Sequence, residues 1–279
     1  MTDNLLEVEG LVREFAVRGR HQNVKAVDDV SFTIARGEAL GLVGESGSGK
    51  STTARCVLRL IEPTSGTVRL NGVDITSLRG RELREFRAKA QLVFQDPYSS
   101  LNPRMRVEEI IAEGIRIHRP RVKDAEVRDE IVALLEVVGL RPDHLTRKPA
   151  AFSGGERQRI GIARALAVNP ELLVCDEPVA SLDVSIQAQI LNLFQDLKAR
   201  LGLTLLYIAH DLATVRHLCD RVAVMEQGQI REIGTRDQLY NDPQAAYTKA
   251  LMAAVPRPDP IEERRKLAAR RAALTGATP

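Results

Sequence analysis

Eight consecutive residues have the composition and spacing of a phosphate-binding loop. They are Gly44-Glu45-Ser46-Gly47-Ser48-Gly49-Lys50-Ser51, and they fit the pattern G-x-x-x-x-G-K-S/T. Glycines let backbone N–H groups curl around phosphate oxygens, and the start of a following helix adds a partial positive charge. Lys50 would reach the β and γ phosphates, and the Ser51 hydroxyl would be a ligand of Mg²⁺. The alternative is a glycine-rich turn without a ligand.

Two adjacent carboxylates, Asp176 and Glu177, follow the apolar run Leu172-Leu173-Val174-Cys175. A phosphate-binding loop needs an acidic element that holds the metal ion and a base that activates water. We therefore predict that Asp176 orients Mg²⁺ and its waters, and that Glu177 accepts the proton of the attacking water. The alternative is an acidic strand end at a turn, because Pro178 comes next.

Alternating strand and helix patterns are predicted to position these residues. The apolar run at 39–43 should be a fully buried parallel strand, and helical spacing follows Lys50 until Pro63. Strand-like runs at 172–175, 204–208 and 221–225 are separated by helical patterns at 186–201 and 212–218. Residues from about 106 to 150 have helical spacing throughout. The pattern predicts a mostly parallel sheet that is interrupted once by a helical lobe.

Composition excludes several classes of protein. Apolar residues make up 44% and charged residues 28% of the 279 residues, which is ordinary globular usage. A net charge of +3, no Trp and 4% aromatic residues argue against a nucleic-acid partner. No apolar run of 18 residues and no signal pattern is present, so we expect no membrane span and no secretion. Cys56, Cys175 and Cys219 have no metal-ligand spacing and should be reduced, buried thiols.

A third motif, Ser153-Gly154-Gly155-Glu156-Arg157-Gln158-Arg159, resembles the signature sequence of ABC ATPases. In that family the motif opens a helix and faces the ATP of a partner subunit. A hydroxyl, two glycines and a helix N-terminus suit a γ-phosphate. Ser153 and Glu156 also fit a capping box, and both interpretations can hold.

Further motifs follow in the order of that family, and the resemblance covers nearly the whole chain. It implies that Gln95 contacts Mg²⁺ and water, that Ser181-Leu182-Asp183 crosses between two ATPase subunits, and that His210 contacts the γ-phosphate. It also implies an aromatic partner for adenine. Phe15 is our candidate, and the alternative is that Phe15 is a core strand residue.

The resemblance implies a fold and a site. The fold is an α/β P-loop NTPase: an ABC-type nucleotide-binding domain with a RecA-like core, an antiparallel β region and an inserted helical subdomain. The predicted domain spans 1–255, with the helical subdomain at about 98–165, a C-terminal element at about 237–256 and a charged tail at 257–279. The predicted catalytic residues are Glu177, His210 and Gln95, and the predicted metal ligands are Ser51, Gln95 and Asp176. The predicted ATP-binding residues are Phe15, Gly44, Glu45, Ser46, Gly47, Ser48, Gly49, Lys50, Ser51 and Thr52, with Ser153, Gly154, Gly155 and Glu156 facing the partner's ATP.

Two separated segments indicate the branch of the family. The block at 91–104 and the stretch at 241–256 resemble ATPase subunits of oligopeptide, dipeptide and nickel importers, and the first looks more like the shorter of the two ATPases. The resemblance implies two permease subunits, a second ATPase, an extracytoplasmic binding protein and a place at the cytoplasmic face of the cell membrane. No cysteine follows Cys219, so no iron–sulfur site is expected. Position 156 is Glu where the family usually has Gln, and Phe152 stands where Leu is usual.

We therefore predict an ATP-hydrolysing subunit that powers uptake of short peptides or related small solutes. Two such domains would close head to tail around two ATP molecules and switch the permeases from inward to outward facing. The alternatives are an ATPase of another ABC transporter class and a soluble ABC ATPase without a permease.

Overall fold

A six-stranded mixed sheet forms the centre of the computed structural model, which describes residues 3–16 and 23–253. Its strands in spatial order are β10 (Gln229–Thr235), β9 (Arg221–Glu226), β3 (Ala39–Val43), β8 (Thr204–Ala209), β7 (Leu172–Asp176) and β6 (Ala90–Val93). Neighbours from β9 to β6 run parallel, and β10 pairs antiparallel with β9. The mostly parallel sheet predicted from the alternating pattern is confirmed.

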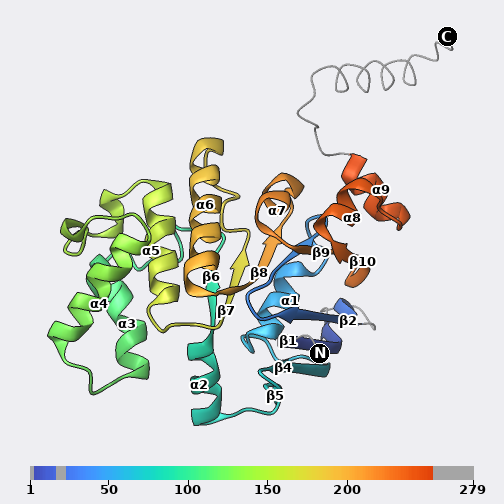
Figure 1. Cartoon of the computed structure of the whole chain (residues 1–279). Coiled ribbons are helices and arrows are strands. Elements are labelled where there is room, and N and C mark those ends of the chain that lie inside the picture. Colours follow the sequence, from blue (N-terminus) through green and yellow to red (C-terminus); the bar gives the residue numbers. More distant parts are fainter. Residues whose placement is uncertain (1–2, 17–22, 254–279) are drawn as a thin grey trace, which may run out of the picture.

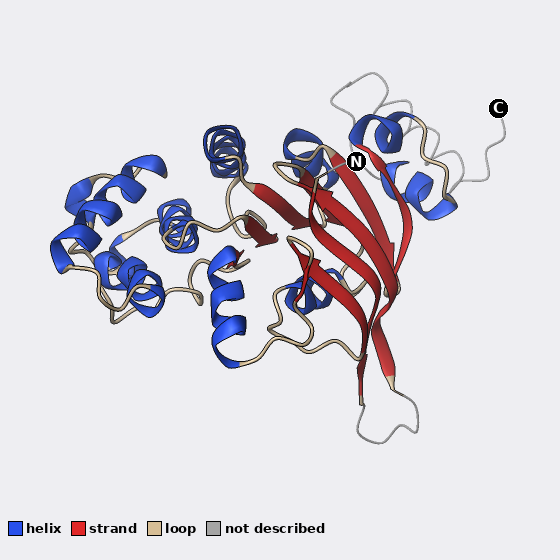
Figure 2. Cartoon of the chain, turned by 60° about the horizontal axis from the view of Figure 1, so that its bottom comes forward, coloured by secondary structure: helices blue, strands red, loops and turns tan. Residues whose placement is uncertain are grey.

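A second sheet is antiparallel and lies beside the first (Figures 1 and 2). Its strands in spatial order are β2 (Val24–Ala35), β1 (Asn4–Phe15), β4 (Ser65–Leu70) and β5 (Val73–Asp74). Alternating apolar residues such as Val30, Phe32 and Ile34 point inward from β2 and are buried. The predicted antiparallel β region is therefore present.

Two hydrophobic clusters cover opposite faces of the central sheet. Leu40 and Leu42 of β3 point into a cluster shared with the antiparallel sheet and with α1 (Lys50–Val57). Ala39 and Val43 point into the other cluster, which includes most of the remaining helices. A strand buried on both faces must be apolar throughout, which explains why residues 39–43 show no polar alternation.

The helices divide between the core and a lobe at one end of the molecule (Figure 1). In the core, α6 (Val184–Leu201) and α7 (Leu212–Leu218) follow β7 and β8, and α2 (Gly80–Lys89) precedes β6. The lobe contains α3 (Val107–His118), α4 (Asp124–Val137), two short 3₁₀ turns, η1 (Pro142–His144) and η2 (Pro149–Ala151), and α5 (Gly154–Leu166). The chain leaves the sheet after β6 and returns to it at β7, so the lobe is one insertion, as predicted.

Two short helices, α8 (Arg236–Asn241) and α9 (Ala246–Ala253), follow β10 and close the described chain. Residues 254–256 of the predicted C-terminal element and the predicted tail at 257–279 lie outside the described residues. Among the described residues, no helix has the length and apolar character needed to cross a membrane.

All three cysteines are free and buried, as predicted. Burial raises the pKa of the Cys56 thiol to about 11, and it raises the pKa of Cys175 and Cys219 further.

Candidate functional site

Four adjacent strands deliver the predicted phosphate-site residues to one edge of the sheet. The loop at 44–51 follows β3, and His210 follows β8. Asp176 is the last residue of β7, Glu177 comes directly after it, and Gln95 follows β6. Since β3, β8, β7 and β6 are parallel neighbours, their carboxyl ends lie at the same edge. Ligands of open α/β sheets bind at this edge.

The amine of Lys50 is buried inside the loop that precedes it. Lys50 is 4% exposed, and its Nζ donates to the carbonyl oxygens of Gly44 at 2.8 Å and Glu45 at 2.7 Å. Burial lowers the pKa of Lys50, while Glu177 and Asp176 oppose that shift. The carbonyls therefore fix the position of a cation that has few contacts with water.

The loop can adopt this shape only with glycine at two positions. Gly44 has φ 153°, and a Cβ there would lie 2.0 Å from the backbone oxygen of Met225. Gly49 has φ 105°, and a Cβ there would lie 2.2 Å from the backbone oxygen of Ala26. The close approach of β9 and β2 to the loop explains why glycine is required there.

Ser51 and Asp176 form the oxygen-rich corner of the site. The Ser51 hydroxyl donates to Oδ1 of Asp176 at 2.8 Å, and Asp176 is 7% exposed. Burial raises the pKa of Asp176, although Ser51, Arg55 and Lys50 act in the opposite direction. A hydroxyl and a carboxylate are the hard oxygen donors that Mg²⁺ prefers, so these residues fit the predicted ion.

One oxygen of Glu177 joins the three predicted catalytic residues. The Gln95 amide Nε2 donates to Oε2 of Glu177 at 3.0 Å, and Nδ1 of His210 lies 3.0 Å from the same oxygen. The His210 tautomer that carries its proton on Nδ1 can donate to this carboxylate. Residues that are 82 and 33 positions away from Glu177 are thus brought together.

The backbone of Glu177 is strained. Its φ is 46°, in the left-handed region that side chains other than glycine rarely adopt. The N–H of Glu177 donates to the carbonyl of Ile208 at 3.0 Å, which holds the residue against β8. Such strain is frequent at functional sites, where it fixes the direction of a reactive side chain.

The segment at 153–156 begins helix α5 with a capping box, as predicted. The Glu156 N–H donates to Oγ of Ser153 at 3.4 Å, and the Ser153 N–H donates to Oε2 of Glu156 at 2.9 Å. The Ser153 hydroxyl also donates to this carboxylate at 2.8 Å. These hydrogen bonds from Ser153 lower the pKa of Glu156. Phe152, the other unusual residue, is buried edge-on against His144 at 5.1 Å between ring centroids.

Helix α5 also holds the segment that contains Gln95, a connection that the sequence reasoning missed. Arg164 donates to the carbonyl of Ser100 at 2.6 Å, and Gln158 donates to the carbonyl of Phe94 at 3.3 Å. The Arg157 guanidinium lies 4.2 Å from the centroid of the Tyr98 ring. Arg157 and Arg164 are seven residues apart and therefore lie on one face of a helix. This spacing was the signal in the sequence that could have indicated a shared contact surface.

The loop at 181–183 is anchored by the helix that follows it. The Gln187 amide in α6 donates to the carbonyls of Val179 and Leu182, both at 3.0 Å. These bonds hold Ser181 and Asp183 in a defined loop that continues directly from Glu177.

Phe15 is the last residue of β1 and is 37% exposed. The Arg13 guanidinium lies 4.5 Å from its ring centroid. The alternative that Phe15 is a core residue is therefore wrong, and an aromatic ring remains available at this strand end.

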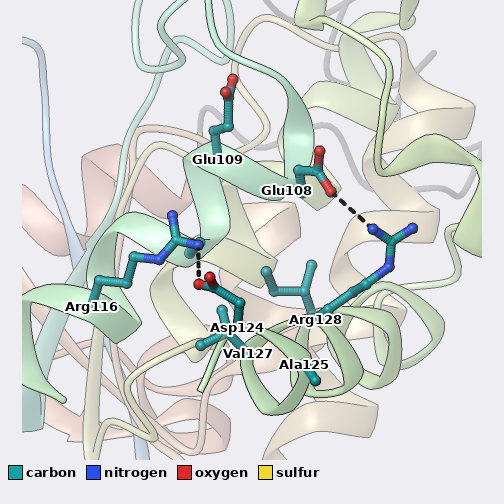
Figure 3. Close-up of a pocket in the computed structure, with 9 residues that line it drawn as sticks. Glu108, Glu109, Arg116, Asp124, Ala125, Val127 and Arg128 are labelled. Carbon is teal, nitrogen blue, oxygen red and sulfur yellow. Dashed lines mark hydrogen bonds and ion pairs between the residues drawn. The ribbon is translucent and has the colours of Figure 1, made fainter. Parts of the chain in front are cut away.

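A separate hollow between α3 and α4 is lined by paired charges (Figure 3). Its volume is about 410 Å³. Arg116 pairs with Asp124 at 2.8 Å, and Arg128 lies 3.8 Å from Glu108. Because these cations already face carboxylates, the hollow is not suited to phosphate, and the candidate site is the sheet edge.

Comparisons with known sequences identify the family. The family model described as "ABC transporter" matches residues 27–180. The oligopeptide transport ATP-binding protein OppF of Streptococcus mutans is 52% identical over 96% of this chain and 87% of its own length. The dipeptide transport ATP-binding protein DppF of Lactococcus lactis is 50% identical over 94% of this chain and 84% of its own length.

Two solved structures of ABC proteins have the same fold. The first is the ATP-binding cassette MJ0796, in a dimeric post-hydrolysis state bound to ADP and Pi. It superposes with a TM-score of 0.75 and is 27% identical, and the match covers 83% of this chain and 98% of that chain. The protein cbiO1 of Clostridium perfringens, part of the complex cbiONQ, gives a TM-score of 0.75 at 26% identity, covering 86% of this chain and 92% of that chain.

The burial of Asp176 predicts a conflict between stability and function. Because its pKa is raised in the folded chain, ionised Asp176 costs stability at neutral pH. Asp176→Asn should raise the midpoint of thermal unfolding of the nucleotide-free chain by about 2 °C while it abolishes Mg²⁺-dependent ATP hydrolysis.

Unfolding scans between pH 4 and 8 test this expectation. The gain should shrink as the pH falls through the raised pKa of Asp176, because the wild-type carboxyl then becomes neutral as well. Asp196→Asn, on the exposed side of α6, should change the midpoint little at any pH. A lower midpoint for Asp176→Asn at pH 8 would contradict the account.

Proposed function

Because this chain belongs to the ABC transporter family of ATP-binding proteins, we propose that it hydrolyses ATP to power the uptake of short peptides through a membrane importer. The carboxylate oxygen of Glu177 shared by Gln95 and His210, beside the buried Lys50, is the observation that carries the reaction. The peptide cargo rests on the relatives, which are named as oligopeptide and dipeptide transport proteins.

In this mechanism Glu177 accepts the proton of the water that attacks the γ-phosphate. Before hydrolysis, Gln95 and His210 orient the carboxylate, because both lie 3.0 Å from Oε2. During hydrolysis His210 would turn toward the γ-phosphate, and Gln95 would turn toward water. The His210 side chain is 56% exposed and free to rotate toward a ligand.

Lys50 provides the positive charge for the β and γ phosphates. Two of its three N–H bonds are taken by carbonyls of the loop at 2.8 and 2.7 Å, and the third makes only a longer contact of 3.4 Å with Ser48 Oγ, which a phosphate oxygen would replace. Backbone N–H groups of the loop at 44–51 and of Thr52 complete the cradle. The residues that would hold Mg²⁺ are Ser51, Asp176 and Gln95, and the bound ion would neutralise phosphate charge.

Two further groups of residues would contact nucleotide, one this chain's own ATP and the other the ATP of a partner. Phe15 would stack on adenine, which its exposed position at the end of β1 permits. Ser153, Gly154 and Gly155, with Glu156 behind them, would face the ATP of a partner ATPase across a head-to-tail dimer. The Ser153 hydroxyl must then redirect its proton from Glu156 to the partner's γ-phosphate.

An apolar groove supports docking of permease subunits. The groove lies between α2, β6 and the helical lobe and has a volume of about 330 Å³. Leu60, Phe94 and Ile117 line it and are 51%, 45% and 53% exposed. Large apolar side chains exposed together mark a protein interface. Since Phe94 precedes Gln95, a permease seated here would act directly on the catalytic site.

The proposed assembly contains two permeases and two ATPases at the cytoplasmic face of the cell membrane. We favour a second, related ATPase over a second copy of this chain, because importers with such sequences generally pair two different ATPases. The helical lobe at about 98–165 would move with the permeases. The domain at 1–255, with its C-terminal element at about 237–256, would do the chemistry. An extracytoplasmic binding protein would supply the cargo, and no nucleic acid takes part.

An affinity pull-down from native membranes in mild detergent tests the transport assignment. Mass spectrometry should identify two permeases and a second ATPase with the tagged chain. Recovery of ribosomes or DNA-repair proteins would favour the soluble ABC ATPase, and recovery of other permeases would favour another transporter class.

Glu177→Gln should keep ATP binding and lower turnover by about 100-fold or more, because the amide cannot accept the proton. Equilibrium ATP binding and steady-state phosphate release measure the two effects. Glu136→Gln, on the exposed side of α4, serves as the matched control and should leave both unchanged. Near-normal hydrolysis by Glu177→Gln would reject Glu177 as the base.

Ser153→Arg should damage the partner's ATP site more than this chain's own site, because the signature acts across the dimer. The measurement is hydrolysis by a reconstituted pair in which one P-loop lysine at a time is inactivated. Equal damage at both sites would contradict the head-to-tail arrangement.

A further inference from the structure

The peptide unit between Gly44 and Glu45 is held at both of its ends. Its carbonyl, that of Gly44, accepts from Lys50 Nζ at 2.8 Å. Its N–H, that of Glu45, donates to the hydroxyl of Tyr247 at 3.3 Å. The C=O and N–H of a trans peptide point in opposite directions, so a contact at one end fixes the tilt at the other.

Lys50 depends on that tilt. Its Nζ makes two short hydrogen bonds, to the carbonyls of Gly44 and Glu45, and a longer one of 3.4 Å to Ser48 Oγ. Rotation of the Gly44 carbonyl would remove one of the two short bonds. The buried amine would then have to rearrange, with a cost in desolvation that burial makes larger.

Tyr247 comes from a distant part of the sequence that is itself anchored. It lies in the first turn of α9, 202 residues after Glu45, and it packs against the hydrophobic cluster that contains Ala39 and Val43. Glu232 of β10 accepts from the N–H groups of Gln244 at 2.8 Å and Ala245 at 3.0 Å. A carboxylate that binds the N–H groups at a helix start fixes that helix end.

We propose that Tyr247 is a positioning residue for ATP binding, which sets the orientation of the Gly44–Glu45 peptide and through it the position of Lys50. The C-terminal residues 244–253 are then part of the ATPase mechanism in this chain. The inference rests on the binding of ATP at the loop of residues 44–51, and it is independent of the transported cargo.

Tyr247→Phe in the full-length chain removes the hydroxyl and keeps the ring. The dissociation constant for ATP, measured by equilibrium dialysis without Mg²⁺ so that no hydrolysis occurs, should rise about threefold, the scale of one neutral hydrogen bond. In steady-state assays with Mg²⁺, KM for ATP should rise by a similar factor while kcat stays within about twofold. An unchanged dissociation constant would overturn the proposal, as would a fall in kcat alone.

Tyr240→Phe is the matched control. Tyr240 lies in the neighbouring helix α8, and its hydroxyl donates to the carbonyl of Leu212, away from the loop at 44–51. This variant should lower the unfolding midpoint without changing KM for ATP. If both variants raise KM equally, the effect is one of general stability and the proposal fails.

Glu232→Gln tests the anchor of α9 by a second route. The neutral amide holds the start of α9 more weakly, so this variant should raise the dissociation constant for ATP in the same direction as Tyr247→Phe. The dissociation constant of the double variant should not exceed that of the single variant that binds ATP less tightly, because both changes act on one contact. Additive effects on the dissociation constant would show that Glu232 acts separately from Tyr247, and they would contradict the proposed chain of contacts.

Lys50→Ala distinguishes an error in the role of Tyr247 from an error in the position of the ATP-binding site. If Lys50→Ala binds ATP as well as wild type, the loop at 44–51 is not the nucleotide site. If Lys50→Ala loses binding while Tyr247→Phe does not, the site stands and only the role of Tyr247 is rejected.

Discussion

The withdrawal of three charged groups from water at one sheet edge is the constraint on which the structure depends. Lys50 and Asp176 are 4% and 7% exposed, and the Glu177 side chain is 16% exposed. Charges in such surroundings interact more strongly with each other and with a phosphate than they would in water. They need fixed hydrogen-bond partners, which the backbone carbonyls, Ser51, Gln95 and His210 supply. The parallel order of β3, β8, β7 and β6 brings these partners together.

The parts of this arrangement that sequence predicts are those with a local signature. The loop at 44–51, the buried strand before it and the helix after it each follow from spacing within about twenty residues. The capping box at Ser153 is equally local. The shared carboxylate of Glu177 could be expected only because the carboxyl ends of parallel strands meet at one edge.

Contacts between segments that are distant in the sequence had no comparably specific signal. Arg157 against Tyr98, Arg164 on Ser100 and Tyr247 on Glu45 join segments that are 59, 64 and 202 residues apart. Helical spacing places Arg157 and Arg164 on one face, but neither periodicity nor propensity specifies the partners of these residues, because the pairs arise only when complete elements have packed. The β10 strand and α2 were likewise not predicted, since no residue of β10 is fully buried and α2 buries only Phe86, which leaves little apolar pattern to detect.

The burial of every cysteine has a practical consequence for observing this protein in motion. Cys56, Cys175 and Cys219 are shielded and have raised pKa values, so their thiolate forms are scarce at neutral pH. The wild-type chain therefore offers almost no background to maleimide or iodoacetamide dyes. A single cysteine placed on the exposed face of the helical lobe, and another on α6, would accept a fluorophore pair without removal of any native residue. The distance between lobe and core could then be followed by energy transfer in an otherwise unaltered molecule.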